Sequence, residues 1–358
     1  MKGLVNHKKS VISLFSGCYT ALITPMKKNM EVDFEGLKSL IEFQIKEGVS
    51  GILVTGTTGE SPTLTWEEHE KVIEKAYEYI GGKCVTIAGT GSNNTKEALE
   101  ATKHSYELGV RNFLLVDPYY NGPSSLEIRR EYIEPIAKSF PEAQIIPYII
   151  PGRTGTQLLP YDVAILHKTL PNVNAVKEAT GNFENMKLTR RLCGDDFDIL
   201  SGDDDKTYQM ILDPEIKASG VISVTSNIAP KAVQEFVEAL RSKNLEKANS
   251  LLEALKPLFQ MVTVKTEEES SFGVVSCRAR NPLPYKTLMN ILGMPAGPCR
   301  PPLGKLTKKA LAVVLDQIKK VYNKNPEILQ PIESFFDVRL EERLNNKKYL
   351  EGLYYDKY

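Results

Sequence analysis

The chain has 358 residues, with 45 basic and 45 acidic side chains and a formal net charge of +0. This balance lacks the basic excess typical of proteins that bind nucleic acid or anionic membranes, so neither partner is expected. Apolar residues make up 42% of the chain, enough for a large core, and no apolar run approaches the roughly 20 residues that span a bilayer.

Residues 1–16 are expected to form a disordered lead. The apolar run 11–15 is too short for a signal peptide and lacks a small-residue cleavage site, although a weak organellar transit signal is the alternative interpretation. The five cysteines are odd in number and widely spaced, and the four histidines show no ligand spacing. We therefore expect reduced thiols, a cytoplasmic location and no metal site.

Eight short β-rich runs follow, roughly 25–35 residues apart, and patterns typical of amphipathic helices lie between them. A capping box, Thr65 to Glu68, begins the second helical pattern. Eight regular units without a break predict a closed (β/α)8 barrel over residues 17–243, rather than a doubly wound sheet. The expected strands are Cys18–Ile23, Gly51–Val54, Cys84–Ala88, Asn112–Val116, Gln144–Ile150, Asn174–Lys177, Asp198–Leu200 and Gly220–Val224.

Helical patterns without intervening strands continue at Pro230–Arg241, Leu245–Val262, Tyr285–Leu292 and Thr307–Tyr322. They predict a C-terminal helical domain over residues 244–322, with the acidic run Glu267–Glu269 in a solvated loop. The extension 323–358 mixes charges with aromatic residues. It is expected either to dock as a helix on the barrel or a neighbouring subunit, or to form a mobile tail of unknown role.

Polar and glycine-rich motifs follow the predicted strands, and in a (β/α)8 barrel the carboxyl ends of the strands carry the active site. The motif GTTGES (56–61) follows the second strand, PYYN (118–121) the fourth, and PGRTG (151–155) the fifth. Lys177 ends the sixth strand, SGDD (201–204) follows the seventh, and GVISV (220–224) forms the eighth. Their convergence on one rim predicts a functional site there.

Lys177 is the candidate nucleophile. An amine at the end of a buried strand loses hydration, which can lower the lysine pKa by roughly 3–5 units. The neutral amine can then attack a ketone and form an imine. The alternative is a lysine whose amine reaches solvent from the strand end.

Together with NPLPYK (281–286), these motifs resemble the dihydrodipicolinate synthase family of pyruvate-dependent class I aldolases over residues 17–322. The resemblance implies a lyase that condenses pyruvate with L-aspartate 4-semialdehyde to 4-hydroxy-tetrahydrodipicolinate, the first committed step to diaminopimelate and lysine. No cofactor is implied, because the imine is itself the electron sink. The alternatives are another pyruvate aldolase, acting on a sugar acid or hydroxy-oxoglutarate, and a catalytically silent metabolite-binding barrel.

The resemblance also implies residue roles. Lys177 forms the imine, and Thr57 and Thr58 hold the carboxylate of pyruvate. Tyr148 acts as acid and base through a relay of Thr58 and Tyr120, the latter supplied by an adjacent subunit, because an isolated tyrosine with a pKa near 10 is a poor proton shuttle.

Arg153 would clamp the carboxylate of the semialdehyde, since a guanidinium binds a carboxylate through two hydrogen bonds. Gly202 and the carbonyl of Ile222 would line the pocket, while Asp203–Asp205 would organise the loop. The chain departs from the family pattern at Ile149, where asparagine is usual, and at Pro147, whose missing N–H predicts a bulge in the strand.

A site for L-lysine as effector is implied at a subunit interface, together with a homo-oligomer, expected to be a dimer of dimers. The matching residues are Ser61, Trp66, His69, Asn93, Glu97 and Tyr119. The alternative is that Trp66 and His69 only cover a helix face.

Overall fold

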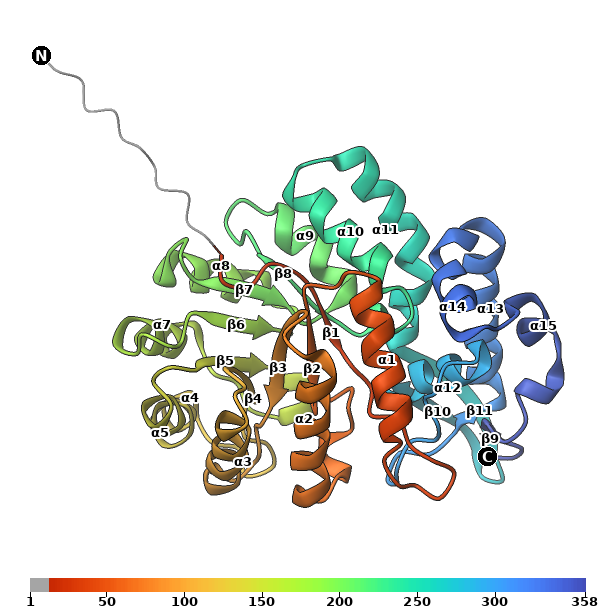
Figure 1. The fold of residues 1–358 in the computed structure, drawn as a ribbon, viewed down its shortest axis with the longest axis horizontal. Coiled ribbons are helices and arrows are strands. Elements are labelled where there is room, and N and C mark those ends of the chain that lie inside the picture. Colours follow the sequence, from red (N-terminus) through yellow and green to blue (C-terminus); the bar gives the residue numbers. More distant parts are fainter. Residues whose placement is uncertain (1–12) are drawn as a thin grey trace, which may run out of the picture.

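The computed structural model describes residues 13–358, in which eight parallel strands form a closed barrel in sequential order (Figure 1). The predicted barrel is confirmed, with strand ends that differ from the expected ones by at most two residues. The expected lead falls mostly on residues 1–12, which lie outside the described residues. The strands are β1 (Gly17–Ala21), β2 (Gly51–Val54), β3 (Val85–Gly89), β4 (Asn112–Val116), β5 (Gln144–Ile149), β6 (Ala175–Glu178), β7 (Asp198–Ser201) and β8 (Gly220–Ser223).

The outer layer consists of helices that pack their apolar faces on the strands. Helix α1 begins after Asp33, whose carboxylate accepts from the N–H of Gly36, and the predicted capping box of Thr65 and Glu68 is present at α2. The principal helices are α1 (Phe34–Lys46), α2 (Trp66–Ile80), α3 (Thr95–Glu107), α5 (Glu134–Ser139), α7 (Pro160–Thr169), α8 (Phe183–Cys193), α9 (Thr207–Leu212) and α10 (Pro230–Arg241).

The interior of the barrel is a second apolar cluster, which includes Leu53 of β2, Ile146 of β5 and Leu200 of β7. Phe15 joins this cluster, and its backbone N–H donates to a carboxylate oxygen of Asp198 at 2.8 Å. Residues 13–16 therefore close the amino-terminal end of the barrel. The polar residues that could perform chemistry are left at the opposite, carboxyl end.

Two antiparallel strands interrupt the C-terminal helical region, where helices alone were predicted. Strands β9 (Thr263–Ser270) and β10 (Gly273–Arg280) pair over their full length, and Glu267–Glu269 lies within β9 rather than in a loop. That prediction is wrong. The acidic residues obscure two β-rich stretches, one at Thr263 to Thr266 and one at Val274 and Val275, and the glycine-containing turn between them.

The extension 323–358 docks on the body of the protein, as the first of the two alternatives expected (Figure 1). Phe335 and Phe336 pack against Phe43 of α1, with ring centroids 5.3 and 5.2 Å apart. The C-terminal elements are α11 (Leu245–Phe259), α12 (Leu283–Leu292), β11 (Leu306–Thr307), α13 (Lys308–Lys324), α14 (Gln330–Phe336), α15 (Leu340–Asn345) and β12 (Tyr354–Tyr355). Strand β12 pairs in parallel with β11.

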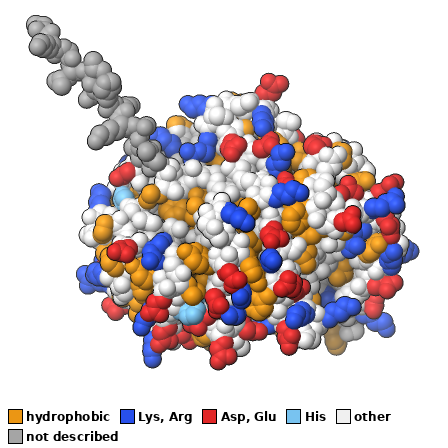
Figure 2. Space-filling view, viewed as in Figure 1, with side chains coloured by type: hydrophobic (Ala, Val, Ile, Leu, Met, Phe, Trp, Pro, Cys, Tyr) orange, Lys and Arg blue, Asp and Glu red, His pale blue; other side chains and the backbone are white. Residues whose placement is uncertain are grey.

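Acidic and basic side chains are interspersed over the face shown in Figure 2, as expected for a chain with no net charge. Within residues 13–358, none of the helices combines the length and the apolar character needed to cross a membrane.

Candidate active site

Lys177 lies in the interior of the barrel, with only 5% of its surface exposed. Its position in β6 is level with Tyr148 of β5 and Leu200 of β7. The amine lies 4.1 Å from the centroid of the Tyr148 ring. Burial lowers the pKa of Lys177 to about 8, against the opposing effect of the Asp203 carboxylate. The alternative of an amine reaching solvent is therefore excluded, and the burial predicted for this lysine is confirmed.

Gly202, at the end of β7, leaves room for the lysine side chain. A Cβ atom at this position would lie 2.7 Å from Cβ of Ala179 and 3.2 Å from Cε of Lys177. The next residue, Asp203, is the acidic group that acts most strongly on the amine, and burial raises its own pKa to about 6. The loop after β7 thus supplies both the space and the counter-charge for Lys177.

Asp204 has the loop-organising role that was expected. Its carboxylate accepts from the backbone N–H groups of Val224 and Thr225, at 3.1 and 2.9 Å, and from the Thr225 hydroxyl at 2.9 Å. These bonds tie the loop after β7 to the end of β8.

Tyr148 is buried beside the lysine, and burial raises its pKa to about 12. A hydrogen bond with the side chain of Thr57, the residue before the predicted Thr58, acts to lower this pKa. Thr58 instead accepts a hydrogen bond from the Asn281 amide at 2.9 Å. Neighbouring side chains in a tight turn point to different sides, so the turn after β2 sends the two hydroxyl groups to different partners. The contact with Tyr148 favours Thr57 for the relay, and the role of Thr58 stays a prediction.

Strand β5 runs without the bulge expected at Pro147. Pro147 is level with Leu115 and Tyr148 with Val116, in unbroken register with β4. Neither Pro147 nor Ile149 thus displaces the tyrosine from its strand position.

A cavity of about 220 Å³ opens at the carboxyl end of the barrel, lined by Thr57, Tyr119, Tyr148, Ile150 and Arg153 among others. Arg153 lies at its rim in the short helix α6 (Pro151–Thr154) and donates to the Asn281 carbonyl at 2.9 Å. Ile222 is buried in the barrel interior.

Asn281 was not predicted as a site residue, although its motif was noted. Its side chain binds Thr58, its carbonyl binds Arg153, and its side-chain oxygen is buried without a hydrogen-bond partner among the described residues.

Tyr120 points away from this cavity in the single chain. Its side chain is 91% exposed, and its backbone has a positive φ of 77°. A left-handed conformation is costly for a tyrosine and is found mainly at functional sites. The neighbouring Tyr119 instead turns inward and lines the cavity. One chain alone therefore does not bring Tyr120 to Tyr148.

A second cavity of about 180 Å³ adjoins the first, and all six residues predicted for the effector site line it. Ser61 and Tyr119 line both cavities. The ring of Trp66 meets that of His69 edge to face at 5.0 Å, and burial lowers the pKa of His69 to about 4. Glu97 accepts from the Ser92 hydroxyl at 2.6 Å. The cavity thus combines a carboxylate with aromatic walls.

The GTTGES turn is anchored to the helical region by a buried ion pair. The Lys286 amine lies 2.7 Å from the carboxylate of Glu60, and both side chains are almost completely buried. The same amine donates to the carbonyls of Thr24 and Pro298 at 2.9 and 2.7 Å, and the N–H of Arg300 donates to Glu60 at 2.8 Å. A buried pair with its remaining hydrogen bonds satisfied holds a loop in one geometry.

Comparison with known proteins identifies the family to which the chain belongs. The model of the Dihydrodipicolinate synthetase family matches residues 14–321. The chain belongs to this family. It is similar to the 4-hydroxy-tetrahydrodipicolinate synthase of Methanococcus maripaludis, with 41% identity over 82% of this chain and 93% of the relative.

Two solved structures are also similar to this chain. Dihydrodipicolinate synthase from Aquifex aeolicus is 38% identical, with a TM-score of 0.78 over 86% of this chain and 98% of that one. The enzyme from Cyanidioschyzon merolae, solved with lysine bound, is 34% identical, with a TM-score of 0.78 over 87% and 99%. The chain is accordingly a lyase of the class I aldolase type, with 4-hydroxy-tetrahydrodipicolinate synthase activity in lysine biosynthesis.

Proposed function

We propose that Lys177 forms an imine with pyruvate and that the resulting enamine condenses with L-aspartate 4-semialdehyde. The observation that carries this proposal is the buried amine of Lys177, with a lowered pKa, against the ring of Tyr148. The amine attacks the ketone, water leaves, and loss of a methyl proton gives the enamine. The enamine carbon attacks the aldehyde, and the substrate's own amine then displaces Lys177 as the product closes its ring.

Proton transfer in these steps is assigned to Tyr148. Its partner Thr57 links it toward the cavity mouth, where Tyr120 of a neighbouring subunit would continue the chain to solvent. Thr58 and the backbone of the same turn would hold the carboxylate of pyruvate, and Gly202 and the Ile222 carbonyl would face the imine. Arg153 would bind the carboxylate of the semialdehyde at the rim.

Borohydride reduction tests the proposal. Incubation with pyruvate and borohydride should add one reduced pyruvate per chain, on the peptide that carries Lys177. Peptide mass mapping locates the adduct. Labelling on another lysine, or none, would refute the mechanism. Reaction with a sugar acid but not with the semialdehyde would favour the alternative aldolase.

L-Lysine is the proposed effector of the second cavity. Glu97 supplies a carboxylate for an ammonium group, and Trp66 offers an aromatic face. The lining residues that the two cavities share, which include Ser61 and Tyr119, give a direct route from this cavity to the catalytic one.

Glu97→Ala should raise the lysine concentration for half-inhibition about tenfold or more, because a charged hydrogen bond is lost. The KM for pyruvate should stay unchanged. Glu100→Ala, one turn further along α3 and exposed, is the matched control. Absence of inhibition at millimolar lysine in the unmodified enzyme would contradict the assignment.

The proposed assembly is a dimer of dimers in the cytoplasm. Two features support the assembly: Tyr120 is exposed away from its own site, and the second cavity opens beside the same loop. The five cysteines are free thiols, which supports the location.

A further inference from the structure

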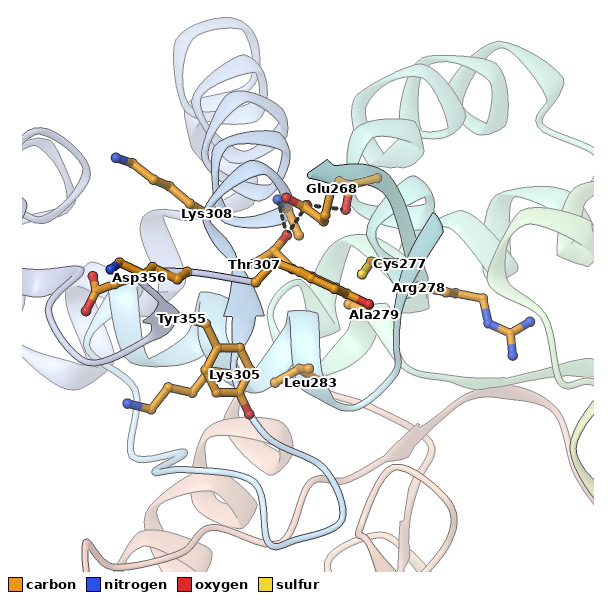
Figure 3. A pocket seen from close by; sticks show the side chains of 14 residues that line it. Glu268, Cys277, Arg278, Ala279, Leu283, Lys305, Thr307, Lys308, Tyr355 and Asp356 are labelled. Carbon is orange, nitrogen blue, oxygen red and sulfur yellow. Dashed lines mark hydrogen bonds between the residues drawn. The ribbon is translucent and has the colours of Figure 1, made fainter. Parts of the chain in front are cut away.

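The β9–β10 hairpin has two different faces because side chains alternate along its strands. Thr266, Glu268, Cys277 and Ala279 face a cavity of about 470 Å³ that α13 and the chain end also line. Figure 3 shows the Glu268 carboxylate next to Thr307, which donates to it at 2.6 Å. Arg278 also lines this cavity, but its guanidinium points away from it. Arg278 and Arg280 therefore share the opposite face of β10.

That opposite face meets the rim of the candidate active site. Arg280 donates from Nη1 to the carbonyl of Gly152 at 3.2 Å, and Arg153 donates from Nη2 to the carbonyl of Asn281 at 2.9 Å. Each guanidinium thus binds the backbone next to the other arginine. The two bonds hold the base of the hairpin against the loop after β5. Arg153 lines the cavity, and Arg280 is close enough to Tyr148 to act on its pKa.

Within residues 13–358, these guanidinium groups form no salt bridge with a carboxylate. The arginine ion pairs among residues 13–358 are those of Arg129 and Arg300. Arg153, Arg278 and Arg280 are close enough to repel one another, and Asp203 is the acidic residue that acts on both Arg153 and Arg280. A guanidinium has five N–H donors, so the two backbone bonds leave most donors of Arg153 and Arg280 free.

We propose that Arg280 is a second substrate-binding arginine, which binds the carboxylate of the incoming aldehyde substrate together with Arg153. Two guanidinium groups without carboxylate partners among residues 13–358, held beside the cavity by backbone carbonyls, have free donors with which to bind an anion. Arg278, further along the same face, adds to the positive field that attracts the substrate. The inference rests on the proposed function, which supplies a second substrate with a carboxylate.

The decisive variant is Arg280→Gln, because glutamine removes the charge but keeps a donor for the Gly152 carbonyl. The KM for L-aspartate 4-semialdehyde should rise about tenfold or more, the scale expected for losing a charged hydrogen bond. The KM for pyruvate and the borohydride labelling of Lys177 should stay unchanged. Arg280→Lys should recover part of the loss. Lys308→Gln removes one charge at the cavity on the hairpin's other face and is the matched control.

Arg278→Gln should leave the KM for pyruvate unchanged and weaken the salt dependence of kcat/KM for the semialdehyde, because a field effect is screened by ions. An unchanged semialdehyde KM in Arg280→Gln, or equal increases for both substrates, would overturn the inference. Should Arg280→Gln not fold, Arg280→Lys and Arg278→Gln still give the two readouts. Failure of the unmodified enzyme to trap pyruvate would instead count against the proposed function.

Discussion

Replacing Lys177 with alanine should lower turnover by about four orders of magnitude or more, because the covalent route is lost with the amine. The variant should remain folded, since alanine removes a buried amine that forms no salt bridge within residues 13–358 and leaves the strand in place. Steady-state kinetics and a thermal melt measure the two effects. Lys206→Ala, in the loop after β7 but half-exposed and paired with Asp205, is the control.

The pH dependence of imine formation gives an independent test of the same residue. With a pKa of about 8, roughly one amine in ten is neutral at pH 7, against about one in three thousand at a pKa of 10.5. The rate of imine trapping should rise about tenfold per pH unit below pH 7 and level off above pH 8 to 9. A rate still rising tenfold per unit at pH 10 would show that the amine has an ordinary pKa.

The second large effect is expected at Tyr120. Tyr120→Phe removes the hydroxyl that would complete the proton path, and loss of a positioned acid or base lowers the rate by about 10²–10⁴-fold. Because the side chain points out of its own subunit, the catalytic rate should fall in the neighbouring subunit's site. Tyr161→Phe, another exposed tyrosine, should have little effect.

Mixing two inactive variants tests this arrangement. In a mixed dimer of Tyr120→Phe and Lys177→Ala subunits, one site contains an intact lysine and the partner's intact tyrosine. An equimolar mixture that reassorts freely should recover about a quarter of the full activity, since about half of the dimers are mixed. Recovery should be absent when either variant is incubated alone. A fully active monomer in sedimentation at assay concentration would show that adjacent subunits do not supply Tyr120 to one another.

The barrel and the position of Lys177 could be predicted from the sequence because both depend on strong local patterns. Buried parallel strands are apolar throughout, and the motifs that follow them must meet at one rim. The sequence could not decide between Thr57 and Thr58 as the partner of Tyr148, because two adjacent threonines look alike and only the turn geometry sets the direction of each hydroxyl.

The hairpin escaped prediction because Glu267–Glu269 masks its alternation. The two partners of Asn281 could not be foreseen either, since they come from the distant positions 58 and 153. Contacts of this kind depend on tertiary structure, which local propensity does not encode.

The last strand of the chain has a consequence for the order of assembly. Strand β12, at Tyr354 and Tyr355, pairs with β11, which includes Thr307, and the Thr307 hydroxyl donates to Glu268 on the hairpin. A chain emerging from the ribosome can close its barrel long before these residues are made. The support behind the hairpin is completed only when translation has passed Tyr355. Chains that terminate before Tyr354 would thus contain the catalytic lysine but lack the strand pair that supports the hairpin beside the cavity.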